Sequence, residues 1–113
     1  MRVARLILVL VMSCVAIVAA EGAGKLKVLV VTGGHGFEEK EFFEVFRANK
    51  GIEFTHAEHT KGTSDVYDRA DLYSYDVVVL YDMVQNITEA QKAKFKGLFE
   101  RGIGLVVMHH ALV

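Results

Sequence analysis

The chain has a single cysteine, no hydrophobic run as long as a transmembrane helix and no excess of basic residues. Cys14 is the only cysteine among the 113 residues. If the N-terminal segment is removed after Ala20, the remaining chain has no thiol. This excludes a disulfide, a thiolate metal site and a cysteine nucleophile from the mature protein.

The N-terminal apolar stretch is short for a membrane span. This stretch, residues 6–20, is shorter than the roughly 20 residues of a transmembrane helix. Two arginines precede it. A basic start, an apolar stretch and small residues before Glu21 predict a secretory signal peptide, residues 1–20. We therefore expect an exported protein, periplasmic or extracellular. A retained membrane anchor is the alternative, and acylation of Cys14 is a weaker one.

The charge balance does not indicate a nucleic-acid partner. The chain has 13 Lys and Arg and 14 Asp and Glu. Two of the arginines lie within residues 1–20, where no acidic residue occurs, so residues 21–113 have 11 basic and 14 acidic residues. Nucleic-acid-binding domains are instead basic. We expect a small-molecule partner, no nucleic acid, and membrane contact only through the signal sequence. The sequence leaves a homo-oligomer open.

Three apolar runs and one alternating segment predict a β-sheet. The runs are nearly continuous, as in strands that are buried on both faces of a parallel sheet. They are residues 26–31, 77–81 and 103–108. Residues 52–57 alternate between apolar and polar side chains, which is typical of an edge strand. The polar segment 58–75 is expected to be a surface connection.

Two amphipathic helices are predicted between these strands. Residues 38–49 begin with glutamates and are followed by glycine. Residues 89–101 follow a capping box, in which Thr88 and Gln91 each bond the other's backbone N–H. The side chains expected to pack inward are Phe42, Val45 and Phe46 in the first helix and Phe95, Leu98 and Phe99 in the second.

Alternating strands and helices define the expected fold class. They predict an α/β, flavodoxin-like doubly wound parallel sheet, of which about four strands are present. The sequence ends soon after the fourth predicted strand, and residues 21–113 are expected to be the N-terminal part of one larger domain.

The ligand crevice of such a sheet lies beyond the carboxyl ends of the strands. Residues 32–37, 81–83 and 109–110 follow three of the predicted strands. The glycines of the first segment match neither a dinucleotide fingerprint nor a P-loop, and the glutamates after them would compete with a phosphate. We expect these glycines to permit a tight turn and a close backbone approach.

Three histidines, an aspartate and a glycine are the candidate site residues. His109 is the leading candidate for proton transfer and His35 is the second, because imidazole titrates near neutral pH. The expected substrate-binding residues are Gly34, His35, Asp82 and His110. Alternatively, His35 bonds the loop backbone, and one of the adjacent histidines is structural because neighbouring strand residues point to opposite faces. Asp82 could pair with His35 or His109, accept hydrogen bonds from ligand hydroxyls or cap its loop.

No cofactor is predicted. A divalent metal ion held by His35, Asp82 and His109 is an alternative, although these positions show no ligand spacing. A second group of titratable residues, His56, Glu58 and His59, lies by the expected edge strand and is interpreted as solvated.

Three separated segments resemble the ThuA-like (trehalose-utilisation) family. They are VLVVTGGHGF (28–37), YDVVVLYDM (75–83) and GIGLVVMHHA (102–111), together with the helix that follows Thr88. The resemblance spans residues 25–113. It implies a flavodoxin-like fold of the class I glutamine amidotransferase-like superfamily and a role in using trehalose or related carbohydrates. It does not imply amidotransferase activity, because His109 stands where that superfamily has its cysteine.

The sequence therefore predicts an exported domain that binds or processes a sugar, or an oxidised sugar, at the carboxyl ends of the strands. Whether it is an enzyme is left open, with a sugar-processing hydrolase or lyase as the catalytic reading. A non-catalytic carbohydrate-binding or scaffold module is one alternative. A metal-dependent hydrolase is another.

Overall fold

A computed structural model describes residues 24–60, 65–83 and 86–112 of the chain. The predicted signal peptide and Cys14 lie outside these residues. Within the described part, no helix combines the length and the apolar character that a membrane crossing needs.

The described chain forms a four-stranded parallel sheet. Its strands are β1 (Leu26–Gly33), β2 (Ile52–Glu58), β3 (Val77–Asp82) and β4 (Gly104–Val107), in the spatial order β2-β1-β3-β4. β1 pairs with β2 and β3, and β3 also pairs with β4, all in parallel. This arrangement confirms the predicted α/β class and is consistent with an incomplete flavodoxin-like fold.

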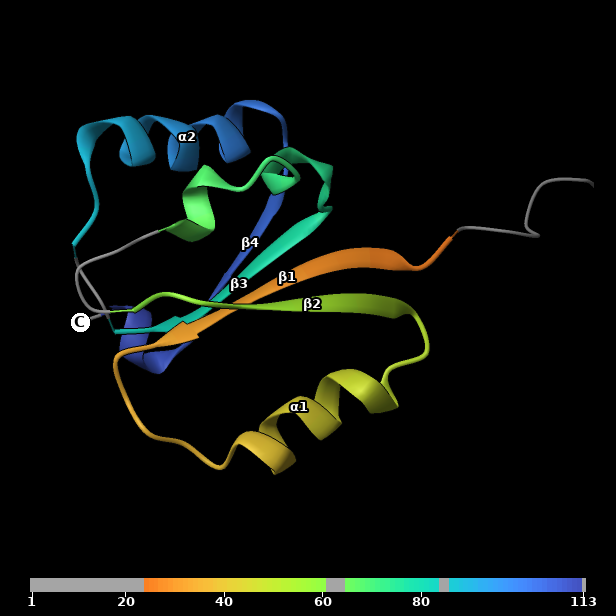
Figure 1. The fold of residues 1–113 in the computed structure, drawn as a ribbon. Coiled ribbons are helices and arrows are strands. Elements are labelled where there is room, and N and C mark those ends of the chain that lie inside the picture. The colour runs from red at the N-terminus through yellow and green to blue at the C-terminus, as the bar shows by residue number, and fades with distance from the viewer. Residues whose placement is uncertain (1–23, 61–64, 84–85, 113) are drawn as a thin grey trace, which may run out of the picture.

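Two helices cover opposite faces of the sheet (Figure 1). α1 (Glu39–Ala48) lies on one face and α2 (Glu89–Glu100) on the other. The predicted capping box is confirmed, since Thr88 Oγ1 accepts from the Gln91 N–H at 3.1 Å and Gln91 Oε1 accepts from the Thr88 N–H at 3.0 Å. Short 3₁₀ helices, 65–68, 72–74 and 109–112, complete the described structure.

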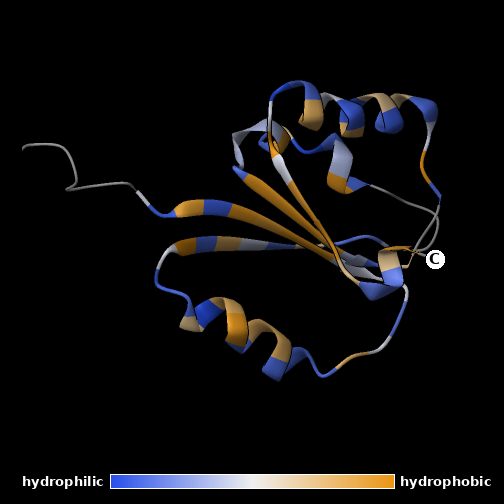
Figure 2. Ribbon diagram, turned by 180° about the vertical axis from the view of Figure 1, so that it is seen from behind, coloured by the Kyte–Doolittle hydropathy of each residue, from blue (hydrophilic) through white to orange (hydrophobic). Residues whose placement is uncertain are grey.

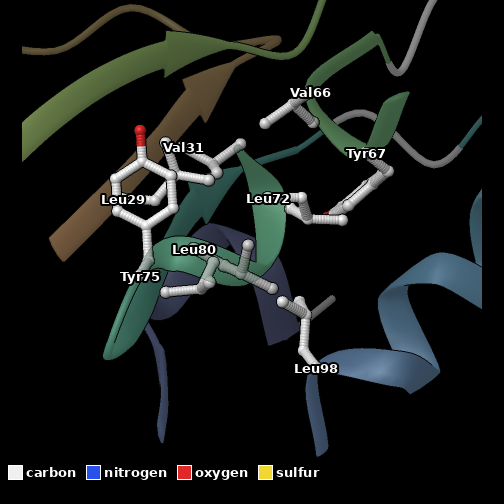
Figure 3. Close-up of a cluster of buried hydrophobic side chains, with 9 residues drawn as sticks. Leu29, Val31, Val66, Tyr67, Leu72, Tyr75, Leu80 and Leu98 are labelled. Carbon is white, nitrogen blue, oxygen red and sulfur yellow. The ribbon is translucent and has the colours of Figure 1, made fainter. Parts of the chain in front are cut away.

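The sheet separates two apolar cores. β1, β3 and β4 are hydrophobic along most of their length, whereas β2 and both helices alternate between hydrophobic and hydrophilic residues (Figure 2). Toward α2, a buried cluster joins the sheet to α2 and to the first two 3₁₀ helices (Figure 3). It contains Leu29, Val31, Val66, Tyr67, Leu72, Tyr75, Val78, Leu80 and Leu98. Toward α1, the buried residues are Val28, Val30, Phe43 and Val79.

Three details of the predicted packing are wrong. Val45 is 70% exposed, and Phe43 is buried in its place because the apolar face of α1 is rotated from the expected one. On α2, Phe99 is 46% exposed while Leu98 is buried. The fourth strand is also not buried on both faces: Leu105 and Val106 are exposed on β4, which pairs with β3 alone among the described strands.

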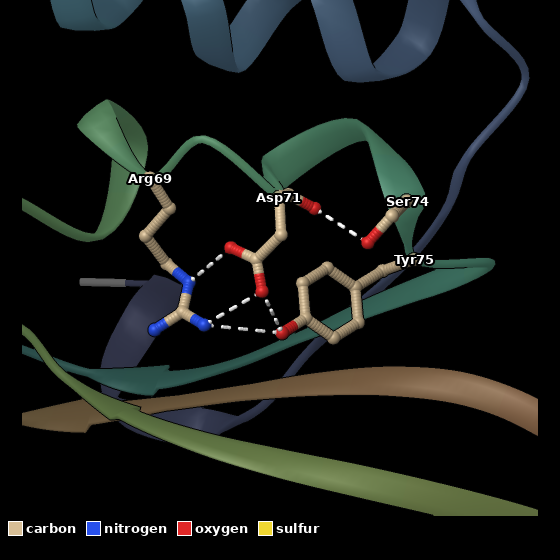
Figure 4. Close-up of polar contacts among 4 residues, drawn as sticks. All are labelled: Arg69, Asp71, Ser74 and Tyr75. Atoms are coloured by element: carbon tan, nitrogen blue, oxygen red, sulfur yellow. Dashed lines mark hydrogen bonds and ion pairs between the residues drawn. The ribbon is translucent and has the colours of Figure 1, made fainter.

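The connection between β2 and β3 is more than a surface loop, which corrects the prediction. It buries Val66, Tyr67 and Leu72 against the sheet. A polar network stabilises its second half (Figure 4). Arg69 donates two hydrogen bonds of 2.8 Å to Asp71, and the Tyr75 hydroxyl donates a third of 2.9 Å. These contacts lower the pKa of Asp71 to about 2, the bonds from Arg69 contributing most and that from Tyr75 next.

Candidate functional site

Successive side chains of β3 point to opposite faces of the sheet. Val77 and Val79 pack in the core beneath α1, whereas Val78 and Leu80 pack in the core beneath α2. This alternation places Tyr81 on the α1 face and Asp82 on the α2 face. The two faces therefore present different chemistry at the same edge of the sheet.

An aromatic cluster fills the α1 face at this edge. It consists of His35, Phe37, Phe42, Tyr81 and His110. The His35 ring lies 4.6 Å from the Tyr81 ring and 4.1 Å from the His110 ring, between centroids. Its Nε2 lies 2.9 Å from the Tyr81 carbonyl oxygen and its Nδ1 lies 3.2 Å from that of Gly36. His35 is thus a loop histidine bonded to backbone, the alternative that the sequence left open.

The α2 face has a pocket at the same edge of the sheet. A pocket of about 420 Å³ opens there, within the range of roughly 300–1,000 Å³ typical of small-molecule sites. Polar and apolar groups share its wall, including His59, Tyr67, Asp82, Met83, Phe95 and His110. The pocket lies beyond the carboxyl ends of the strands, where the sequence predicted a ligand crevice.

A buried acid–base pair lies in the wall of this pocket. His59 Nδ1 is 2.7 Å from Asp82 Oδ2, and the two side chains are 3% and 8% exposed. Asp82 therefore pairs with neither His35 nor His109, the two partners that the sequence suggested. The interpretation of His59 as solvated is wrong, whereas His56 and Glu58 are exposed as expected.

The strand register explains why His59 reaches Asp82. Thr32 pairs with Glu58 at the end of the β1–β2 ladder, and the His59 N–H continues it by donating to the Thr32 carbonyl at 2.7 Å. The His59 backbone crosses Gly33 so closely that a Cβ atom there would lie 1.9 Å from the His59 carbonyl oxygen. Gly33 also has φ +145°, a conformation that favours glycine. The predicted close backbone approach is confirmed at this residue.

Tyr67 adds a third polar group to the same wall. Burial raises the pKa of the Tyr67 hydroxyl, and the nearby charge of Asp82 raises it further. Its ring meets the His59 ring edge-on, with centroids 6.0 Å apart. Tyr67 is therefore a neutral hydroxyl at physiological pH, able to donate or accept a hydrogen bond.

The adjacent histidines at the end of β4 have different positions. Both lie in the 3₁₀ helix 109–112, so they do not point to opposite faces as strand residues would. His110 lines the pocket and contacts His35, and partial burial lowers its pKa, with smaller effects of His35 and His109. His109 is exposed, lies outside the pocket wall and places its ring 4.9 Å from that of His110. Its predicted role in proton transfer stays a prediction.

The rim of the pocket is charged. Lys92 and Glu89 line it from the first turns of α2 and form an ion pair of 3.8 Å. Gly34 is exposed with φ +83° and lies outside the pocket wall, as does His35. Over residues 24–60, 65–83 and 86–112, no three His, Cys, Asp or Glu side chains form a group that could hold a metal ion.

The sequence could have revealed His59 through the period of β2. Ile52, Phe54 and His56 share one face of this strand, and continuing the alternation past Ala57 places His59 on the opposite face. Tyr67 had no comparable signal, because its burial depends on how the connection folds onto the sheet.

Comparisons with known proteins add no relative. No family model, no curated protein and no solved structure matches the chain.

Proposed function

We propose that this protein is an exported, ThuA-like domain that binds a sugar or an oxidised sugar in the pocket on the α2 face. The observation that carries the proposal is the buried His59–Asp82 pair in the wall of a pocket of about 420 Å³ at the carboxyl ends of the strands. The three segments that resemble the ThuA-like family support the sugar as the ligand class.

The composition of the pocket suits a sugar. A sugar ring offers hydroxyl groups that donate and accept hydrogen bonds, and C–H groups that pack on apolar side chains. The carboxylate of Asp82, the imidazole of His59 and the phenol of Tyr67 are groups that form hydrogen bonds with such hydroxyls. Phe95 and Met83 supply apolar surface in the same wall. Few polar groups set in an apolar wall are typical of small-molecule sites.

The arrangement accounts for binding more directly than for turnover. His109, the leading proton-transfer candidate, lies outside the pocket wall. A non-catalytic carbohydrate-binding module therefore remains the second candidate function. Release of a product from a bound sugar would distinguish the enzyme from this module.

A thermal-shift measurement tests the proposal. The purified protein is heated with trehalose, with other disaccharides and with their keto forms. A ligand of the native state at tenfold its Kd should raise Tm by roughly 5 °C or more. His110→Ala should lose this rise, because His110 lines the pocket. His109→Ala, one residue away and outside the wall, is the matched control and should retain it.

Two results would contradict the proposal. If none of the sugars changes Tm, the sugar-binding function is wrong. If His109→Ala abolishes the rise and His110→Ala retains it, the sugar binds outside this pocket.

A further inference from the structure

We propose that His59 presents an Nε2–H group to the ligand in the pocket on the α2 face, and that Asp82 holds the ring in this orientation. The ligand group that it recognises is an acceptor oxygen, such as the carbonyl oxygen of an oxidised sugar or the ring oxygen of a sugar. The ligand part of this inference rests on the proposed function.

The two contacts of the His59 ring indicate which nitrogen carries a hydrogen. Nδ1 is 2.7 Å from Asp82 Oδ2, and Nε2 is 3.4 Å from the Asn86 carbonyl oxygen. A carbonyl oxygen only accepts hydrogen bonds, so the second contact is a hydrogen bond only if Nε2 carries a hydrogen. The requirement for a hydrogen on Nε2 is the same whether the hydrogen between Nδ1 and Oδ2 is bonded to the imidazole or to the carboxyl group.

The Nε2–H is incompletely used within the protein. Its contact with Asn86 lies beyond the 2.7–3.2 Å usual for N–H···O bonds, whereas the bond between Nδ1 and Asp82 is short. A hydrogen in such a long contact can be shared with a second acceptor. Since His59 lines the pocket, an oxygen of the ligand is a suitable second acceptor.

Asp82 acts through His59 and is a positioning residue in this scheme. The hydrogen bond that one ring nitrogen makes sets the form and orientation of the other. Both side chains are buried, so the ring cannot turn freely toward solvent. The close passage of the His59 backbone over Gly33 restrains the backbone of the same residue.

His56 provides a matched comparison on the same strand. It lies on the opposite face of β2, where its Nε2 is 2.7 Å from Thr32 Oγ1 and its ring packs on Phe43. It is outside the pocket wall. A histidine substitution there tests whether losing any imidazole on β2 affects the ligand.

The experiment is NMR spectroscopy of the protein labelled with ¹⁵N at histidine, first without ligand and then with trehalose. We expect His59 to show a hydrogen on Nε2 in the free protein, and this signal to shift when trehalose is added. An Nε2 without hydrogen in the free protein would overturn the inference and leave the proposed function standing. An Nε2–H signal that stays unchanged while trehalose raises Tm would also overturn it.

The variants give a second reading. His59→Gln should weaken trehalose binding roughly fivefold or more in Kd, because one hydrogen bond is lost. His56→Gln should leave Kd unchanged. If trehalose and the other sugars fail to raise Tm while free His59 shows its Nε2–H, the proposed function fails and the ligand part of this inference fails with it. The hydrogen on Nε2 would then be confirmed separately.

Discussion

The two faces of the sheet differ most at the ends of the same strands. On the α1 face, Tyr81 and the rings around it fill the space with aromatic contacts. On the α2 face, Asp82 is one residue further along the chain and lies in the wall of a pocket. Because strand side chains alternate, a single step along β3 separates a packed face from a hollow one. The pocket on one face and the packing on the other share His110, which lines the pocket and contacts His35.

The largest expected effect concerns the core beneath the pocket. Leu98→Ala should lower the free energy of unfolding by about 3 kcal/mol, because Leu98 is 1% exposed and its loss leaves a cavity between α2 and the sheet. Phe99→Ala, at the next residue, removes a larger side chain that is 46% exposed and should cost less. Urea unfolding of both variants measures the difference. The assignment of the inner face of α2 fails if Phe99→Ala costs more.

The next effect concerns the backbone that carries His59. Gly33→Ala should cost about 2 kcal/mol, because the new Cβ would lie 1.9 Å from the His59 carbonyl oxygen and φ is +145°. The substitution should also weaken the binding of any ligand in the pocket, because it displaces His59. Gly36→Ala is the control, since no atom lies within 4 Å of its Cβ position. Equal stabilities of the two variants would show that the chain does not pass over Gly33 in this way.

A smaller effect is expected on the packed face. Thr32→Val removes the 2.7 Å contact with His56 and should cost about 1 kcal/mol. Ligand binding should not change, because both residues lie outside the pocket wall. Chemical denaturation and a sugar titration measure the two quantities. Impaired binding in this variant would break the proposed separation of the two faces.

The smallest effect concerns the surface network of the connection. The pKa of Asp71 is lowered from 3.8 to about 2, chiefly by Arg69 and then by Tyr75. A lowered pKa in the folded state adds stability that is present above pH 3.8 and is lost as the pH falls toward 2. Asp71→Asn should therefore unfold with a weaker dependence on pH between 4 and 2. An unchanged dependence would mean that Asp71 is equally acidic in the unfolded chain.

Local patterns were enough to predict the elements of the fold. The apolar runs gave β1, β3 and β4, alternation gave β2, and the Thr88 capping box gave the start of α2. The exact inner faces of the helices were harder, because adjacent aromatic residues such as Phe42 and Phe43 fit either rotation of α1. Only the packing against β1 and β2 decides between them.

The pocket lies at the edge of the sheet where the sequence indicated a crevice, and two of the candidate residues, Asp82 and His110, line it. The crevice at the carboxyl ends of the strands and Asp82 follow from the strand pattern. The partner of Asp82 did not follow, because His59 reaches it through the register of β1 with β2 and the close passage over Gly33. The period of β2 indicates the face on which His59 lies, but not its contact with Asp82, which is 23 positions further along the chain.

The most direct test of the account is to map where a sugar binds. Backbone ¹H–¹⁵N spectra recorded during a trehalose titration report perturbations residue by residue. The account predicts that the largest shifts cluster at His59, Asp82, Phe95 and His110. Shifts that cluster instead around Phe37 and Phe42 on the α1 face, or no shifts at saturating trehalose, would contradict it.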